Sequence, residues 1–185
     1  QEISVRCDGE VETIDTAGVL GRHGGHVPLW YFLQPTRLTE AGRELQALAR
    51  SVAGDDQLQV LHRLAARVLE TVRYDVGHTD TATTADAALA AGHGVCQDHA
   101  HIFIAAARSL GFPARYVSGY LMLTDRVEQE ASHAWAEAHV DGLGWVGFDV
   151  SNGISPDTRY VRIATGTDYS EAAPISGLSY GGGEQ

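Results

Sequence analysis

The hydrophobic period of this chain changes once, and that change constrains the fold more than any other feature of the sequence. From residue 39 to residue 110, apolar side chains recur at helical spacing, as in Leu45, Leu48 and Val52. From residue 116 to residue 149, apolar and polar residues alternate as they do in strands. Because the helices come first and the strands last, the pattern predicts an α+β fold rather than alternating α/β units.

Four helices and three strands are expected. The helices are predicted over residues 39–52, 58–72, 85–91 and 96–110, and the strands over residues 116–123, 133–140 and 145–149. The first fifteen residues alternate around an Asp8-Gly9 turn and predict a hairpin. Residues 17–35 are rich in glycine and proline and predict a loop whose aromatic residues pack onto the main body.

Composition narrows the possible partners. The chain has 185 residues and a formal net charge of -11, which argues against nucleic acid or an anionic membrane as the main partner. A hydrophobic content of 44% is enough for a buried core. Two cysteines, Cys7 and Cys96, are too few for a disulfide scaffold, and they favour a reducing, cytoplasmic location.

Cys96 is the most informative residue for chemistry. It follows the Gly92–Val95 segment and begins the fourth predicted helix. A helix N-terminus offers unpaired N–H groups and a partial positive charge, which stabilise a thiolate and an oxyanion beside it. The glycines allow a substrate to approach closely. The alternative is an inert buried cysteine, since free cysteine is among the most buried residue types.

His133 and Asp149 are candidates for the base and for its orienting partner. If residues 141–143 form a three-residue hairpin loop, Val140 pairs with Gly144, and His133 then lies diagonally beside Asp149 on one face of the sheet. A two-residue loop would place them on opposite faces. The alternatives are a strand-end histidine bonded to backbone and an aspartate that forms an Asx turn with residues 151–153.

The other polar residues near these candidates are expected to have structural roles. His99 and His101 are two residues apart on a helix and point in different directions, so together with His93 and Cys96 they do not form a metal site. No metal and no cofactor are expected. Glu137 shares the predicted face of His133 and is expected to be a solvated strand residue.

Four blocks of sequence together resemble the core of the transglutaminase-like superfamily. The blocks are Gly92–Ala100, Gly111–Tyr120, Ser132–Glu137 and Gly144–Asp149. They occur in order, and the resemblance extends over about residues 34–168. It is strongest to bacterial transglutaminase-like proteins that are often labelled cysteine proteases.

The resemblance implies a fold and a mechanism. The fold would be a papain-like α+β core with the nucleophile at the N-terminus of a helix packed on an antiparallel sheet. The catalytic triad would be Cys96, His133 and Asp149. The catalytic domain would cover residues 34–170, preceded by the remnant of a larger β-rich domain in residues 1–33 and followed by a tail, residues 171–185. The chain would then be truncated or processed at its N-terminus.

The expected activity is attack on a peptide or isopeptide amide through an acyl-enzyme thioester. Hydrolysis is favoured over transamidation, because nothing in the sequence excludes water or selects an amine acceptor. A protein-glutamine transamidase, an acyltransferase that uses a small thioester donor and a non-catalytic binding module remain open. Animal transglutaminases carry a Trp after the nucleophile, where this chain has Gln97, so the side-chain donor to the oxyanion is left open between Tyr74 and His78.

Overall fold

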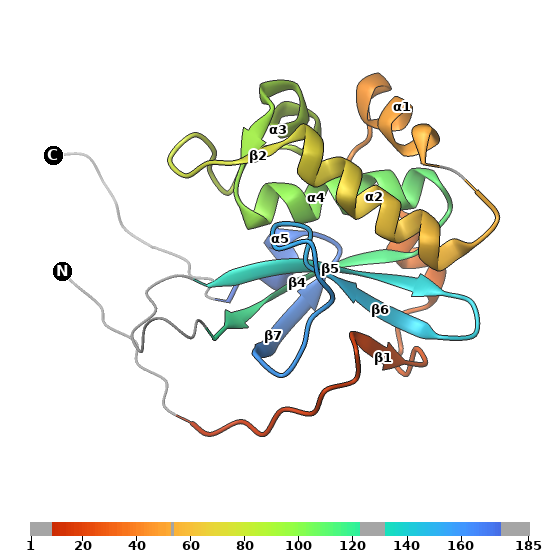
Figure 1. Cartoon of the computed structure of the whole chain (residues 1–185), viewed down its shortest axis with the longest axis vertical. Coiled ribbons are helices and arrows are strands. Elements are labelled where there is room, and N and C mark those ends of the chain that lie inside the picture. Colours follow the sequence, from red (N-terminus) through yellow and green to blue (C-terminus); the bar gives the residue numbers. More distant parts are fainter. Residues whose placement is uncertain (1–8, 53, 123–131, 175–185) are drawn as a thin grey trace, which may run out of the picture.

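A layer of helices covers one face of a curled antiparallel sheet in the computed structural model, which describes residues 9–52, 54–122 and 132–174 (Figure 1). The sheet has five strands in the order β1-β6-β5-β4-β7, and every neighbouring pair is antiparallel. A second, parallel ladder joins β2 to β3. The predicted α+β class is confirmed.

The elements have the following bounds. The helices are η1 (Leu29–Leu33, 3-10), α1 (Arg43–Ser51), α2 (Gln57–Thr71), α3 (Ala85–Ala91), α4 (Cys96–Ser109) and α5 (Tyr169–Ala172). The strands are β1 (Val19–Gly21), β2 (Arg73–Tyr74), β3 (His93–Gly94), β4 (Ala114–Leu121), β5 (His133–Val140), β6 (Gly144–Phe148) and β7 (Tyr160–Gly166). The four predicted helices and the three predicted strands are therefore present, with shifts of a few residues at some ends. Leu123, the last residue of the first predicted strand, lies outside the described residues.

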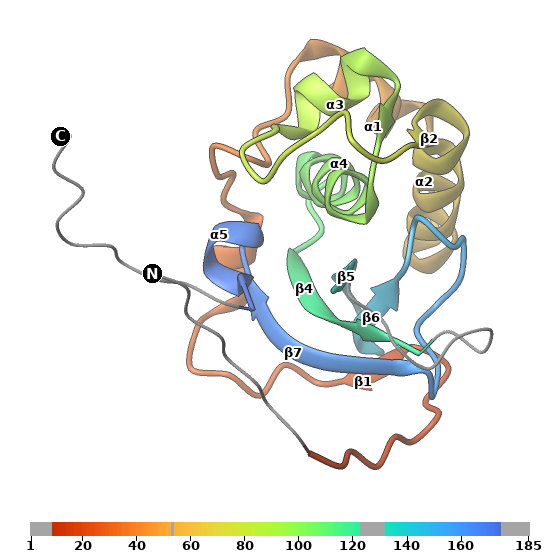
Figure 2. The same ribbon diagram turned by 90° about the vertical axis from the view of Figure 1, so that its left-hand side faces the viewer.

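Helix α4 forms the centre of the molecule. Figure 2 shows it end-on, with α1, α2 and α3 on one side and strands β4, β5 and β6 on the other. Every residue from Asp98 to Arg108 is buried. Three consecutive alanines, 105–107, allow both layers to approach the helix closely because they carry no bulk beyond Cβ. The first residue of this helix, Cys96, is therefore anchored to the core.

Side chains cap the N-termini of α2 and α3. The Asp56 carboxylate accepts the Gln59 N–H at 2.9 Å at the start of α2. The Thr84 hydroxyl accepts the Ala87 N–H at 3.2 Å at the start of α3. Such caps satisfy backbone donors that the first turn leaves without partners, and each is worth about 1 kcal/mol.

The N-terminal prediction is wrong in its described part. Residues 1–8 lie outside the described residues, and residues 9–15 form no strand. The strand of this region is β1, which pairs with β6 and forms one edge of the sheet. The loop that follows packs as expected, since the Phe32 ring meets the Trp145 ring edge-on at 5.2 Å. The division at residues 33/34 and 170/171 stays a prediction.

Strand β7 was not expected from the sequence. Residues 160–166 pair with β4, some 45 residues earlier in the chain, and the register shifts between Ser118 and Gly119. None of the described helices is both long and apolar enough to cross a membrane.

Candidate active site

The backbone before Cys96 is held by Asp98. This carboxylate accepts the Val95 N–H at 2.8 Å and the Thr79 hydroxyl at 2.7 Å. Gly94 is required here, because a Cβ at this position would lie 2.7 Å from the Asp98 side chain. These contacts fix the turn into α4, and they leave Cys96 half-buried at the first position of the helix.

The hairpin register brings His133 to Asp149. Val140 pairs with Gly144 and Ala136 with Phe148, so the loop has the three residues 141–143. With this register, Nε2 of His133 lies 2.6 Å from Oδ2 of Asp149. The imidazole is 14% exposed and the carboxylate is fully buried. The predicted geometric relation between these two residues is therefore present in the structure.

Asp149 accepts three further hydrogen bonds, from two residues, besides its bond with the ring. The Asn152 side-chain amide donates to Oδ2 at 2.7 Å, and its backbone N–H donates to Oδ1 at 3.2 Å. The Tyr160 hydroxyl also donates to Oδ2, at 2.7 Å. The Asx turn, the alternative use of Asp149, thus exists together with the histidine contact. Tyr160 was missed, because its strand was missed.

The pKa values of His133 and Asp149 are shifted in opposite directions. Burial alone would lower the pKa of His133, but hydrogen bonds with Asp149 and with Cys96 raise it to about 9. Burial would raise the pKa of Asp149, but the hydrogen bond and charge of His133, with the bonds from Asn152 and Tyr160, lower it. At neutral pH the ring is therefore an imidazolium that lies against a carboxylate and beside the cysteine side chain.

We expect the His133 resonance to titrate near pH 9 in NMR spectra of histidine-labelled protein, with assignment from a His133→Gln difference spectrum. In Asp149→Asn the midpoint should fall by about one pH unit or more, because the strongest partner of the imidazolium is neutral. A midpoint unchanged by Asp149→Asn would contradict this account.

The same shift has a consequence for the stability of the wild-type protein. A raised folded-state pKa stabilises the fold fully below the ordinary value of 6.5. That stabilisation should be lost as the pH rises from 6.5 towards 9, and urea titrations across this range measure it.

The other histidines of α4 are structural. His99 is bonded through Nδ1 to the Ser151 hydroxyl and through Nε2 to the Val72 carbonyl, both at 2.9 Å. His101 accepts the Tyr169 N–H at 3.2 Å, and burial lowers its pKa to about 4. Within residues 9–52, 54–122 and 132–174, no group of three His, Cys, Asp or Glu side chains is placed to bind a metal ion.

Of the two oxyanion candidates, Tyr74 lies nearer the site. It pairs with Gly94 in the β2–β3 ladder, two residues before Cys96, and it is 51% exposed. Burial, and then the charges of Cys96 and Asp149, raise its pKa. His78 instead lies beside Asp75, with Nε2 at 3.4 Å from the carboxylate, and its ring centroid is 4.6 Å from that of His93.

The expectation for Glu137 is wrong. Its side chain is fully buried, with Oε2 2.6 Å from Nε of Arg115 and Oε1 3.1 Å from Nε of Arg162. Arg162 comes from β7, and Arg115 also lies 3.9 Å over the Trp145 ring. The Glu137 carboxylate is thus covered by arginine side chains from two other strands of the same sheet, β4 and β7.

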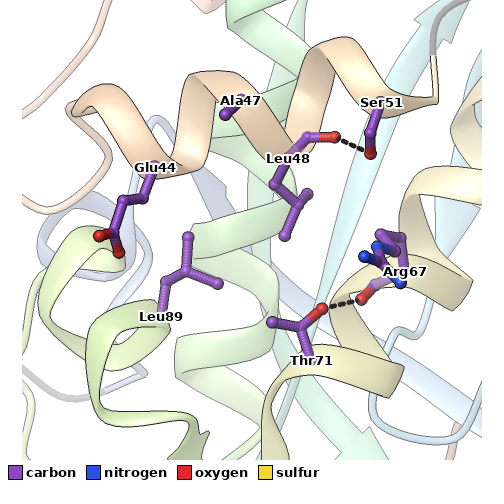
Figure 3. Close-up of a pocket in the computed structure, with 7 residues that line it drawn as sticks. All are labelled: Glu44, Ala47, Leu48, Ser51, Arg67, Thr71 and Leu89. Atoms are coloured by element: carbon purple, nitrogen blue, oxygen red, sulfur yellow. Dashed lines mark hydrogen bonds between the residues drawn. The ribbon is translucent and has the colours of Figure 1, made fainter.

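A surface pocket of about 360 Å³ lies between α1, α2 and α3 (Figure 3). It is lined by Glu44, Ala47, Leu48, Ser51, Arg67, Thr71 and Leu89. Its Ser51 and Thr71 hydroxyls donate to carbonyls of their own helices, at 2.6 and 2.7 Å. Neither Cys96 nor the His133–Asp149 pair contributes to this pocket, so it is separate from the candidate active site.

Comparison with known proteins identifies the family. The model of the transglutaminase-like superfamily matches residues 46–150, which include Cys96, His133 and Asp149. The chain belongs to the transglutaminase-like superfamily. It is 32% identical over 157 residues to protein ML0607 of Mycobacterium leprae and 35% identical over 158 residues to protein Rv2569c of Mycobacterium tuberculosis. These matches cover 82% and 80% of this chain, but 56% and 50% of the relatives, so the chain spans about half the length of the curated relatives it matches.

Two solved structures of other proteins are similar in architecture to this chain. A candidate cysteine protease from Cytophaga hutchinsonii is 31% identical, with a TM-score of 0.69 over 87% of this chain and 55% of that protein. The periplasmic domain of TgpA from Pseudomonas aeruginosa is 26% identical, with a TM-score of 0.56 over 68% of this chain and 47% of that domain.

Proposed function

We propose that this protein is a thiol-dependent enzyme that attacks peptide or isopeptide amides through Cys96, His133 and Asp149, with hydrolysis as its main reaction. The observation that carries the proposal is one imidazole that is hydrogen-bonded to a buried carboxylate and lies close enough to the cysteine at a helix start for that cysteine to raise its pKa. This arrangement supplies a nucleophile, an acid and base, and an orienting group in one place.

The first half of the proposed reaction forms a thioester. The Cys96 thiolate attacks the amide carbon, and the oxygen of the tetrahedral intermediate lies at the N-terminal N–H groups of α4. His133, already protonated, gives its proton to the departing nitrogen as the C–N bond breaks. The products are a free amine and an acyl group on the sulfur, and the ring is left neutral. Asp149 keeps the ring aligned throughout.

The second half returns the enzyme to its starting state. The neutral ring takes a proton from water, and the oxygen of that water forms a bond to the thioester carbon as the C–S bond breaks. The products are a carboxylic acid and the thiolate–imidazolium pair. If an amine replaces the water, the product is a new amide, and the reaction is a transamidation. Cys96 is half-buried and the His133 side chain is 14% exposed, so both residues keep surface open to solvent, which supports hydrolysis.

Product analysis tests this choice. The protein would be incubated with a library of peptides and glutamine-containing amides, with and without a large excess of a primary amine. We expect a thioester adduct on Cys96 by intact mass and free acid as the main product. A main product that contains the added amine would select the transamidase alternative, and acyl transfer from acyl-CoA alone would select an acyltransferase. The lack of any adduct would favour a binding module.

Tyr74 supplies the side-chain donor to the oxyanion in this proposal. We expect Tyr74→Phe to slow acylation by 4-nitrophenyl acetate about 10-fold or more, because the intermediate loses one donor. Alkylation of Cys96 by iodoacetamide should change less than about twofold, since displacement at a saturated carbon creates no oxyanion. The matched control is His78→Gln. Equal slowing of both reactions in Tyr74→Phe, or a loss of acylation only in His78→Gln, would refute the role of Tyr74.

A further inference from the structure

Strand β7 adds a phenol to the carboxylate of the candidate active site. The Tyr160 hydroxyl lies 2.7 Å from Oδ2 of Asp149, the same oxygen that lies 2.6 Å from the His133 ring. Tyr160 is 7% exposed. Burial, and then the hydrogen bond and charge of Asp149, raise the pKa of the phenol, so it remains protonated and acts as the donor.

The position of this phenol is fixed by pairing and packing. Tyr160 pairs with Leu121 of β4 at the end of the β4–β7 ladder. Its ring meets the Trp135 ring edge-on at 5.4 Å and lies 6.0 Å from the His133 ring. Gly119 allows Trp135 to lie there, because a Cβ on Gly119 would come within 2.7 Å of the indole. The hydroxyl is therefore held against Asp149 by the sheet itself.

The hydroxyl competes with the imidazole for one oxygen. Hydrogen bonds to a carboxylate spread its negative charge over several donors, and each donor weakens its attraction for the others. With Tyr160 and Asn152 both donating to Oδ2, Asp149 holds the ring proton less tightly than a carboxylate bonded to the ring alone. This matters because the ring must become neutral before it can take a proton from water.

We propose that Tyr160 is a positioning residue of this site: its hydroxyl shares the Asp149 oxygen that holds His133, fixes the direction of the ring and limits how tightly the carboxylate holds the ring proton. The inference rests on the proposed function, in which that proton is given up and regained once per turnover. It adds to that function a group from β7 that acts only through Asp149.

Other charged or titratable groups face this cluster from each neighbouring element. Cys96 and His99 face it from α4, and Tyr74 faces it from β2. Arg159, which precedes β7, interacts with Tyr160 and Asp149 through its charge alone. Its guanidinium is hydrogen-bonded to Asp157 at 2.7 Å. All of these groups remain in a Tyr160→Phe protein, so that substitution isolates the contribution of the hydroxyl.

The test compares Tyr160→Phe with Tyr120→Phe, a control of identical chemistry at a position on β4 that is 46% exposed. The His133 midpoint is measured by NMR, and turnover of 4-nitrophenyl acetate is measured from pH 5 to 10. In Tyr160→Phe we expect the NMR midpoint and the pH–rate profile of kcat to move upwards together. A displacement of about one pH unit lowers kcat at pH 7 about 10-fold, and KM should stay nearly constant. Tyr120→Phe should change neither measurement.

A double substitution separates positioning from a structural role. In an Asp149→Ala background, Tyr160→Phe should change the residual turnover less than about twofold, because the residue through which it acts is gone. A merely structural loss would lower kcat at every pH without displacing the profile, and it would persist in that background. Asn152→Ala removes the other side-chain donor to Oδ2 and should also move the His133 midpoint upwards. This variant replaces Tyr160→Phe in the test if Tyr160→Phe does not fold.

Three results would overturn the inference. They are a His133 midpoint in Tyr160→Phe that is unchanged or lower, an equal loss of turnover with and without Asp149, and an equal loss in Tyr120→Phe. If the wild-type protein is not acylated by any probe, the proposed function fails. The NMR midpoints, which need no substrate, then still decide whether Tyr160 acts on His133 through Asp149.

Discussion

Replacement of Cys96 by alanine is expected to abolish acyl-enzyme formation and to lower turnover at least about 1,000-fold, because no other group of the site can carry the acyl chain. The matched control is Cys7→Ser, which removes the only other thiol of the chain and should leave turnover nearly unchanged. Intact-mass spectrometry and steady-state rates measure both. Cys96 is half-buried at the first position of α4, so we expect the free energy of unfolding to change by less than about 1 kcal/mol.

A chemical probe separates the thiol from the fold. One equivalent of iodoacetamide at pH 7 should label Cys96 faster than Cys7 in the folded protein, because Cys96 lies at a helix N-terminus beside the His133 ring. Equal labelling rates, or an acyl adduct that persists in Cys96→Ala, would count against Cys96 as the nucleophile.

Replacement of Arg108 by methionine is expected to lower the free energy of unfolding by about 3–5 kcal/mol. This buried guanidinium donates to the carbonyls of Phe32, Ala114 and Thr167 at 2.8–3.2 Å and to the Thr39 hydroxyl at 2.7 Å. Burial lowers its pKa to about 10, so it stays charged at neutral pH. Methionine would leave four acceptors without this donor and would disconnect the segment before α1 from α4 and from the end of β7.

Urea unfolding at pH 7 measures this effect, and Arg67→Met is the matched control. Arg67 pairs with Glu70 at 3.3 Å, with its side chain 54% exposed, and such a surface pair contributes less than about 1 kcal/mol. A loss in Arg108→Met no larger than that in Arg67→Met would contradict the structural role of Arg108.

The elements that the sequence could predict are those that depend on the spacing of nearby residues. The helical period of Leu45, Leu48 and Val52 identified α1. The position of Cys96 at a helix start followed from Gly92 and Gly94. The contact between His133 and Asp149 required only the length of the hairpin loop, which two adjacent strands determine.

What the sequence could not predict depends on contacts between distant segments. Strand β7 pairs with β4 through a shifted register, and no local signal in residues 160–166 identifies that partner. Tyr160 was missed for that reason. Glu137 was expected in solvent for the same reason, because Arg162 on β7 is one of the two cations that bury it. An alternating strand shows which side chains share a face, but it does not show whether that face is covered.

The burial of α4 on all sides decides how this protein can adapt to a ligand. The sulfur belongs to α4, whose buried residues we expect to unfold only when the whole molecule unfolds. The position of the sulfur should therefore stay fixed as long as the protein is folded. Any adjustment on meeting a substrate must come from the ends of the strands that carry the ring and the carboxylate. Loss of thiol reactivity on heating should accordingly coincide with cooperative melting, which would make the rate of labelling at this one atom a convenient reporter of the intact molecule.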